Sequence, residues 1–220
     1  MAAVKRLTLF RAVNLAFAVV LAGAALLDFT TRFTRPAAQA ASLFVDGAPV
    51  PADPNRTAAA VSLDGEVRSD IAASLAIRAL VAPQGTAEAV ASNKAAQDAT
   101  IATLTVSPVN SLMWLTLGLL KAQVNEPAGP ALKASYLTGP LPRDAVVKRI
   151  RAVTTSDAVS DEDVRLLAQL DVRTILTRYP RLEPALAAAY RQATPTGRAF
   201  LLDATQTVDP RFSRLLREYQ

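Results

Sequence analysis

Few residues of this chain could carry out chemistry, because the sequence contains no cysteine and no histidine. These absences exclude thiolate nucleophiles, disulfides, the usual Cys and His zinc sites, and catalytic pairs of Ser or Cys with His. The sequence also lacks a Gly-rich phosphate-binding loop. We therefore predict no catalytic residue, no cofactor and no metal site.

Asp171 is the strongest single candidate for chemistry, because it falls within the apolar arc of a predicted helix, between Leu167 and Ile175 in projection. A buried carboxylate requires a partner, since an unpaired buried charge is costly. Asp171 could act as a general acid or base. We favour a structural role, in which it pairs with an Arg, or accepts a hydrogen bond from a Tyr or Trp, on another helix.

Three consecutive acids at 161–163 form a second candidate site, resembling a metal cluster. Consecutive carboxylates, however, point to different sides of a helix. Ser160 with Asp163 is typical of a capping box, and the remaining acids lie where the helix dipole favours negative charge. We predict a helix start here and no metal site.

The elements that must position these residues are predicted to be helices. The 220 residues include 44 Ala and 29 Leu but only 8 Gly, and no stretch alternates convincingly as a strand. Ala and Leu are among the strongest helix formers. The predicted fold class is all-α.

Capping residues and prolines predict where these helices begin and end. Asp64 is a predicted N-cap, and a helix from about 86 to 104 carries an alanine stripe suited to close packing. Ser107 followed by Pro108 predicts the next helix start. The helix after Ser160 is apolar around most of its circumference, so we expect it to be the most buried helix of the carboxy-terminal half. Further helix starts are predicted at Pro184, Pro195 and Pro210.

The amino-terminal segment predicts a membrane anchor, with a basic leader at 1–11 and a transmembrane helix at 12–31. Basic residues before a span place the amino terminus in the cytoplasm and the rest of the chain in the periplasm. The alternative is a cleaved signal peptide, with Ala22-Gly23-Ala24 as the cleavage site. We favour the anchor because the apolar run continues beyond that site, through Leu27.

Residues 32–62 form a Pro- and Ala-rich linker, and residues 63–220 form the predicted periplasmic helical domain. A Pro-rich linker is extended and semi-rigid, which suits it to hold a domain away from a membrane surface. Its one apolar knot, Leu43-Phe44-Val45, is expected either to form a short strand or to dock on the domain.

The net charge of +5 arises from basic residues that are mixed with acidic ones. The densest basic cluster is Lys148, Arg149 and Arg151, which we interpret as a solvated helix face, with contact to phospholipid or an acidic polymer as the alternative. No aromatic residues interleave with this cluster. We therefore predict no nucleic-acid partner.

A repeat signal lies at 108–142, since Pro108 and Pro142 are separated by the 34-residue tetratricopeptide period. The segment resembles one degenerate tetratricopeptide unit, with Lys121 where the family has Tyr and Ser135 where it has an aromatic residue. The alternative is generic helical packing. The residues that carry the resemblance, which we expect to pack between helices with the Trp in the core, are Trp114, Leu117, Gly118 and Ala131.

The whole pattern is similar to small bacterial membrane-anchored tetratricopeptide-like proteins that accompany cell-surface polysaccharide assembly. The segments that prompt this comparison are 107–114 and 131–136. The resemblance implies a non-enzymatic scaffold in the inner membrane, which contacts lipid through its span and binds a protein partner in the periplasm. The alternatives are a soluble periplasmic binding protein, released by signal-peptide cleavage, and a carboxylate-based enzyme acting on glycans.

Overall fold

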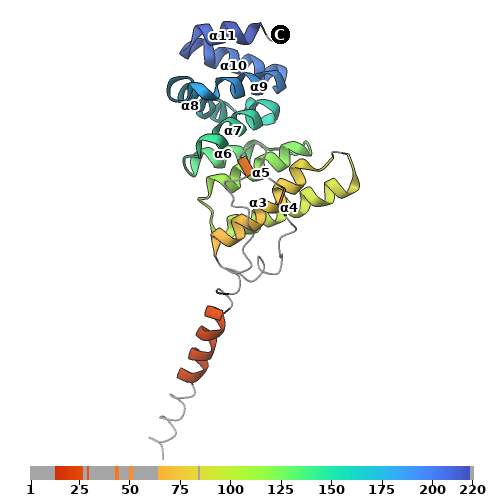
Figure 1. Ribbon diagram of the computed structural model, residues 1–220, viewed down its shortest axis with the longest axis vertical. Helices are drawn as coiled ribbons and strands as arrows, with labels where there is room; N and C mark the ends of the chain where they lie inside the picture. The colour runs from red at the N-terminus through yellow and green to blue at the C-terminus, as the bar shows by residue number, and fades with distance from the viewer. Residues whose placement is uncertain are drawn as a thin grey trace, which may run out of the picture.

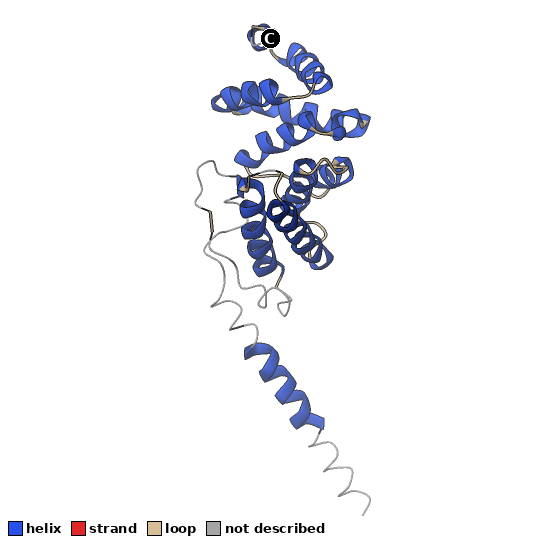
Figure 2. Ribbon diagram, turned by 90° about the vertical axis from the view of Figure 1, so that its right-hand side faces the viewer, coloured by secondary structure: helices blue, strands red, loops and turns tan. Residues whose placement is uncertain are grey.

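The computed structural model describes residues 13–26, 29, 43–44, 50–51, 64–83 and 85–218. Figure 2 shows that all regular structure in this part of the chain is helical, without strands. The all-α prediction is therefore confirmed for the described residues. The leader at 1–11 and most of the linker at 32–62 lie outside them.

The described residues 13–26 and 29 near the amino terminus are helical, and every one of them is exposed. Among the described residues, no helix combines the length and the apolar character that a membrane span requires. The predicted span at 12–31 also includes residues outside the described part.

The remaining helices stack in two layers that rise from α3 and α4 to α11 (Figure 1). One layer is formed by α3, α5, α7 and α9, each in contact with the next. The other contains α6, α8 and α10, while α4 packs on α3 and α5. The bounds are α3 Gly65–Val81, α4 Ala87–Val106, α5 Ser111–Gln123, α6 Gly129–Leu137, α7 Arg143–Thr155, η2 Asp157–Ser160, α8 Glu162–Arg178, η3 Pro180–Leu182, α9 Glu183–Gln192, α10 Pro195–Val208 and α11 Pro210–Arg217.

Several predicted helix ends are confirmed. The Asp64 carboxylate accepts a hydrogen bond from the Glu66 amide at 2.9 Å and caps α3. Prolines occupy the first turns of α9, α10 and α11, as predicted. Proline suits this position, because its missing N–H would have no partner within the helix.

Two predicted caps are wrong by one to three residues. Asn110, and not Ser107, caps α5, and its side chain accepts a hydrogen bond from the Met113 amide at 3.2 Å. Asp161, and not Ser160, caps α8, because its charged carboxylate accepts from two amides, at 2.9 and 3.2 Å. A carboxylate at a helix start also interacts favourably with the dipole, which a serine hydroxyl does not.

The predicted alanine stripe is not the packing face of α4. Four of the six buried residues of this helix are polar, and their side chains make hydrogen bonds either to α5 or to other residues of α4. Asn93 donates to the Leu120 carbonyl at 3.0 Å and to the Gln123 side chain at 2.8 Å, and Gln97 donates to Asn93 at 2.9 Å. A satisfied polar network can occupy a core that periodicity alone assigns to apolar residues.

The prediction that α8 is the most buried helix of the carboxy-terminal half is also wrong. Eight of the 13 residues of α7 are buried, compared with four of the 17 residues of α8. Leu166 and Leu170 of α8 are 57% and 59% exposed. The reason is position: α7 packs against α5, α8, α9 and α10, whereas α8 belongs to the outer layer with α6 and α10.

The apolar knot of the linker docks on the domain, which decides between the two alternatives for its described residues. Leu43 and Phe44 form a short 3-10 turn, and Phe44 is only 2% exposed. Leu43 packs against two core clusters, one built mainly on α3 and the other on helices α5 to α11. The knot therefore joins the first hairpin to the rest of the stack.

Two glycines mark the closest approaches between helices. A Cβ atom at Gly118 of α5 would lie 2.6 Å from Leu132 Cδ2 on α6. At Gly197 of α10, a Cβ would collide with the backbone of Thr154, lying 2.9 Å from its carbonyl carbon and 3.0 Å from its Cα. Backbone atoms cannot move aside as a side-chain tip can, so Gly197 is the more restrictive site.

We predict that Gly197→Ala lowers the free energy of unfolding by about 3 kcal/mol, because overpacking against backbone forces the helices apart. Gly118→Ala should cost about 1 kcal/mol, since the gain in helix propensity offsets part of the strain on Leu132. Gly129→Ala is the matched control, because its Cβ would make only ordinary contacts at 3.7 Å or more. Urea unfolding of the three variants gives the order of their free energies of unfolding. A Gly197→Ala protein as stable as Gly129→Ala would show that the Thr154 backbone does not restrict position 197.

Candidate functional site

A buried ion pair joins α7 to α8. Arg149 of α7 is 5% exposed, and its Nε donates to Asp171 Oδ2 at 2.9 Å. Its Nη2 donates to Asp171 Oδ1 at 3.0 Å, so the two side chains form a bidentate pair. The partner predicted for Asp171 on another helix is therefore Arg149.

The third guanidinium nitrogen extends the pair to α6. Arg149 Nη1 donates to the Ser135 carbonyl at 3.2 Å, and the Ser135 hydroxyl donates to the Ser111 carbonyl at 3.0 Å. The Ser111 hydroxyl in turn donates to the Pro140 carbonyl at 3.2 Å. Ser135 stands where the resembled family has an aromatic residue, and here it connects the buried Arg to the first turn of α5.

Tyr136 completes the cluster from α6. The Arg149 Cζ lies 3.7 Å from the centroid of the Tyr136 ring, a cation–π geometry. The Tyr136 hydroxyl is buried, and no group in the described part of the chain makes a hydrogen bond with it. Burial, together with the nearby Asp171 carboxylate, raises the pKa of Tyr136 well above its ordinary value.

Burial also raises the pKa of Asp171, and this effect exceeds the opposing attraction of Arg149. The Asp171 side chain nevertheless retains 14% exposure. A general acid requires room for a substrate, but neither of the two cavities described below is lined by Asp171, Arg149 or Tyr136. The geometry supports a structural role for this carboxylate.

The other residues that sequence analysis selected lie at the junction of α3, α5 and α6. Leu117 and Ala131 are 5% and 4% exposed and belong to one core cluster. Gly118 leaves room for the Leu132 side chain of α6, as described above.

Trp114 is only half-buried against this cluster, so the expectation that the Trp lies in the core is wrong. Its indole Nε1 must reach the Pro108 carbonyl, to which it donates at 2.7 Å, and this holds the ring at the edge.

Of the acids at 161–163, Asp161 caps α8, and Asp161 and Asp163 both form ion pairs with Lys133. The Asp161 carboxylate caps α8, and hydrogen bonds from the Val164 and Asp163 amides, with Lys133, hold the pKa of Asp161 below its ordinary value. Lys133 also forms an ion pair with Asp163. In the described part of the chain, no group of His, Cys, Asp and Glu is arranged to hold a metal ion.

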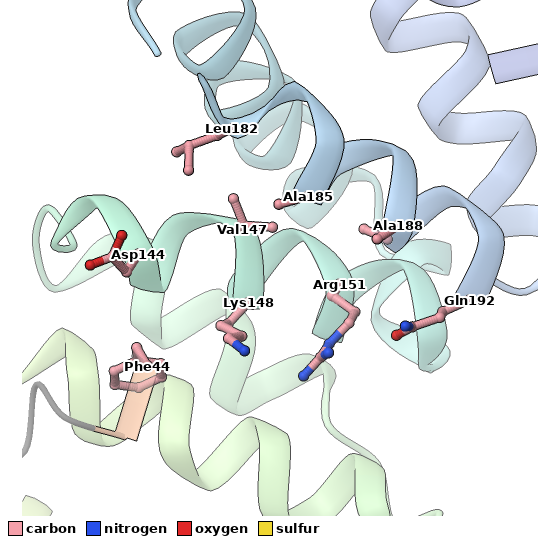
Figure 3. Close-up of a pocket in the computed structure, with 10 residues that line it drawn as sticks. Phe44, Asp144, Val147, Lys148, Arg151, Leu182, Ala185, Ala188 and Gln192 are labelled. Carbon is pink, nitrogen blue, oxygen red and sulfur yellow. The ribbon is translucent and has the colours of Figure 1, made fainter. Parts of the chain in front are cut away.

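The basic cluster divides between the core and a cavity. Arg149 is buried as described, whereas Lys148 and Arg151 line a cavity of about 420 Å³ between α7 and α9 (Figure 3). Phe44 of the linker knot forms one wall. The described residues that line it are Phe44, Asp144, Val147, Lys148, Arg151, Leu182, Ala185, Ala188, Ala189 and Gln192.

A second cavity, of about 440 Å³, lies between the α5–α6 loop, η2 and the start of α10. Its lining is mostly polar and includes Glu126 and Asp157. The Asp157 carboxylate accepts a hydrogen bond from the Ala128 amide at 3.0 Å. Asp157 therefore fixes the turn that leads into α6.

Comparisons with known proteins supply no relative. No protein family, no curated protein and no solved structure matches this chain. The geometry of the described residues therefore carries the functional argument.

The sequence pattern did not identify Arg149, Tyr136 or Phe44 as parts of these sites. One signal could have identified Arg149, because Val146 and Val153 lie three residues before it and four after it, on the same helix face. An Arg flanked by apolar residues at this spacing faces the core. No comparable pattern predicts that Tyr136 stacks on it, since α6 and α7 meet only in the folded chain.

We predict that Asp171→Ala lowers the free energy of unfolding by about 3–5 kcal/mol, because it leaves the Arg149 charge buried without its carboxylate. The matched control is Asp203→Ala on an exposed position of α10, which should change stability by less than about 0.5 kcal/mol. Chemical denaturation measures both. A loss at Asp171 as small as that at Asp203 would show that the pair does not hold the helices together.

We predict that alkaline pH destabilises the protein through Tyr136. Its pKa is raised in the folded state, so above about pH 10 the unfolded chain loses this proton while the native state keeps it. The contribution of Tyr136 to the free energy of unfolding is therefore complete below pH 10. It is lost as the pH rises further, by at most about 1.4 kcal/mol per pH unit.

Tyr136→Phe should remove this alkaline loss and cost less than about 1 kcal/mol at pH 7, because the buried hydroxyl has no hydrogen-bond partner among the described residues. Unfolding curves at pH 8, 10 and 11 make the comparison, with Tyr179→Phe as the control. Equal alkaline sensitivity in the wild-type and Tyr136→Phe proteins would assign the effect to other groups.

Proposed function

We propose that this chain is a non-enzymatic, membrane-anchored scaffold whose helical domain binds a protein partner in the periplasm. The observation that carries the proposal is the stacked helical array with a cavity on its α7–α9 side. Stacked helix pairs present extended surfaces that suit peptides and helices of other proteins. The buried polar cluster at Arg149 and Asp171 is engaged in packing, which leaves the surface as the functional part.

The proposed anchor draws support from the exposed apolar helix at 13–26. Its large apolar side chains, including Leu15 and Phe17, are more than half exposed. A continuous apolar surface of this kind requires a partner, and a lipid bilayer is one that also fits the basic leader in the sequence. The proposed span extends from 12 to 31.

The proposal includes a degenerate tetratricopeptide-like unit at 108–142. The contact of Gly118 with Leu132 and the burial of Ala131 are the features that support it. Pro142 is the N-cap residue of α7, so the proposed period extends from just before α5 to the next helix of the same layer. Lys121, at the position of the family's Tyr, pairs instead with Glu126 at 3.4 Å.

The proposed context is cell-surface polysaccharide assembly, for which the support is the resemblance in sequence organisation: a basic leader, one span, a Pro-rich spacer and an Ala- and Leu-rich helical domain. In this context the scaffold would hold a periplasmic partner close to the inner membrane. Lipid contact would be made by the span alone.

We predict that a reporter active only in the periplasm works when fused after Gln220, and that a cytoplasmic reporter at the same place does not. The basic leader is the physical reason, since it retains the amino terminus inside. Carbonate extraction and the intact mass complete the test. A full-length protein in the membrane supports the anchor, whereas a soluble protein lacking about 24 residues would show cleavage. An active cytoplasmic fusion would contradict the proposed topology.

A further inference from the structure

The cavity between α7 and α9 is built from two helix faces of matching length. Asp144, Val147, Lys148 and Arg151 follow the spacing i, i+3, i+4, i+7 on α7, and Ala185, Ala188, Ala189 and Gln192 repeat that spacing on α9. Residues so spaced share one helix face. A face of this length extends about 10 Å, which accommodates about three residues of extended chain.

The α7 wall of the cavity carries charged side chains, with Lys148 between Asp144 and Arg151, whereas the facing α9 wall is largely alanine. Alanines on α9 leave space opposite Val147, and Figure 3 shows the Asp144 side chain at one end and Arg151 at the other. Within the described residues, the Arg151 guanidinium makes no hydrogen bond or ion pair. A cation in this position favours a carboxylate from a ligand.

The chain itself shows what this surface accepts. Phe44 arrives from the linker, far from α7 and α9 in sequence, and buries all but 2% of its surface beside them. Phe44 also forms a wall of the cavity (Figure 3). The open volume of about 420 Å³ therefore continues a surface on which an apolar side chain of a short chain segment is already docked.

We propose that this cavity, completed by Phe44, binds an extended peptide segment of a partner protein, with an apolar side chain against Phe44 and the α9 alanines and a carboxylate on Arg151. The Asp144 end disfavours a second acid, so the acidic residue has a fixed place in the segment. The linker knot is then part of the binding site as well as of the core. This inference rests on the proposed scaffold function and specifies the chemistry of its partner.

The test uses the full chain in detergent and a dye-labelled dodecapeptide with Leu-Phe-Asp at its centre and Gly-Ser flanks. A second peptide carries Lys in place of the Asp. We expect fluorescence polarisation to show at least about tenfold tighter binding of the Asp peptide at low salt, and a smaller difference at high salt. Equal binding of both peptides, or binding of neither at millimolar protein, would overturn the proposal.

Paired variants locate the site. Arg151→Glu should weaken the Asp peptide at least about tenfold and favour the Lys peptide, whereas Arg165→Glu, on the exposed surface of α8, should change neither. Ala188→Trp should abolish binding by filling the cavity, with Ala91→Trp on exposed α4 as its control. Thermal unfolding verifies that all four proteins fold. Loss of binding in a control variant, or retention in both cavity variants, would place the peptide elsewhere.

Crosslinking in cells separates this inference from the proposed function. A partner held by the wild type and Arg165→Glu, but released by Arg151→Glu, supports both. A partner held equally by all variants overturns the cavity as its site and leaves the scaffold standing. If the wild type crosslinks to no partner, this counts against the scaffold function. The peptide measurement would still show whether the cavity binds an acidic peptide.

Discussion

The bidentate pair between Arg149 and Asp171 is the interaction on which the middle of this stack depends. A charge this deeply buried would be strongly destabilising alone, so the pair requires α7 and α8 to hold one relative position. Because the same guanidinium donates to Ser135 and stacks on Tyr136, the position of α6 is fixed as well. The single side chain of Arg149 therefore specifies how α6, α7 and α8 meet.

A second polar network has a comparable role near the amino-terminal end of the stack. Asn93 and Gln97 of α4 are buried. The Asn93 amide donates to the Gln123 side chain and the Leu120 carbonyl of α5, and the Gln97 amide donates to Asn93. Gln123 also donates to the Ala79 carbonyl of α3 at 3.0 Å. Apolar packing of small aliphatic residues tolerates sliding between helices, whereas directional hydrogen bonds favour one register. A chain so rich in alanine needs this kind of specification.

The linker knot connects these structural features to the proposed site. Leu43 contacts two core clusters and Phe44 closes the cavity between α7 and α9, so one turn of chain outside the domain contributes to both stability and surface shape. In the proposed scaffold, this docking places Leu43 and Phe44 at a defined point on the domain.

The sequence by itself determined the helical class, the cap at Asp64, and the proline-marked starts of α9 to α11, because these depend on local backbone chemistry. It also placed Asp171 on an apolar arc and required a partner from another helix. Only the tertiary structure decided that this partner is Arg149, that α7 is more buried than α8, and that the buried face of α4 is mostly polar. These outcomes depend on which helices are neighbours, and residues distant in sequence become partners only when the layers stack.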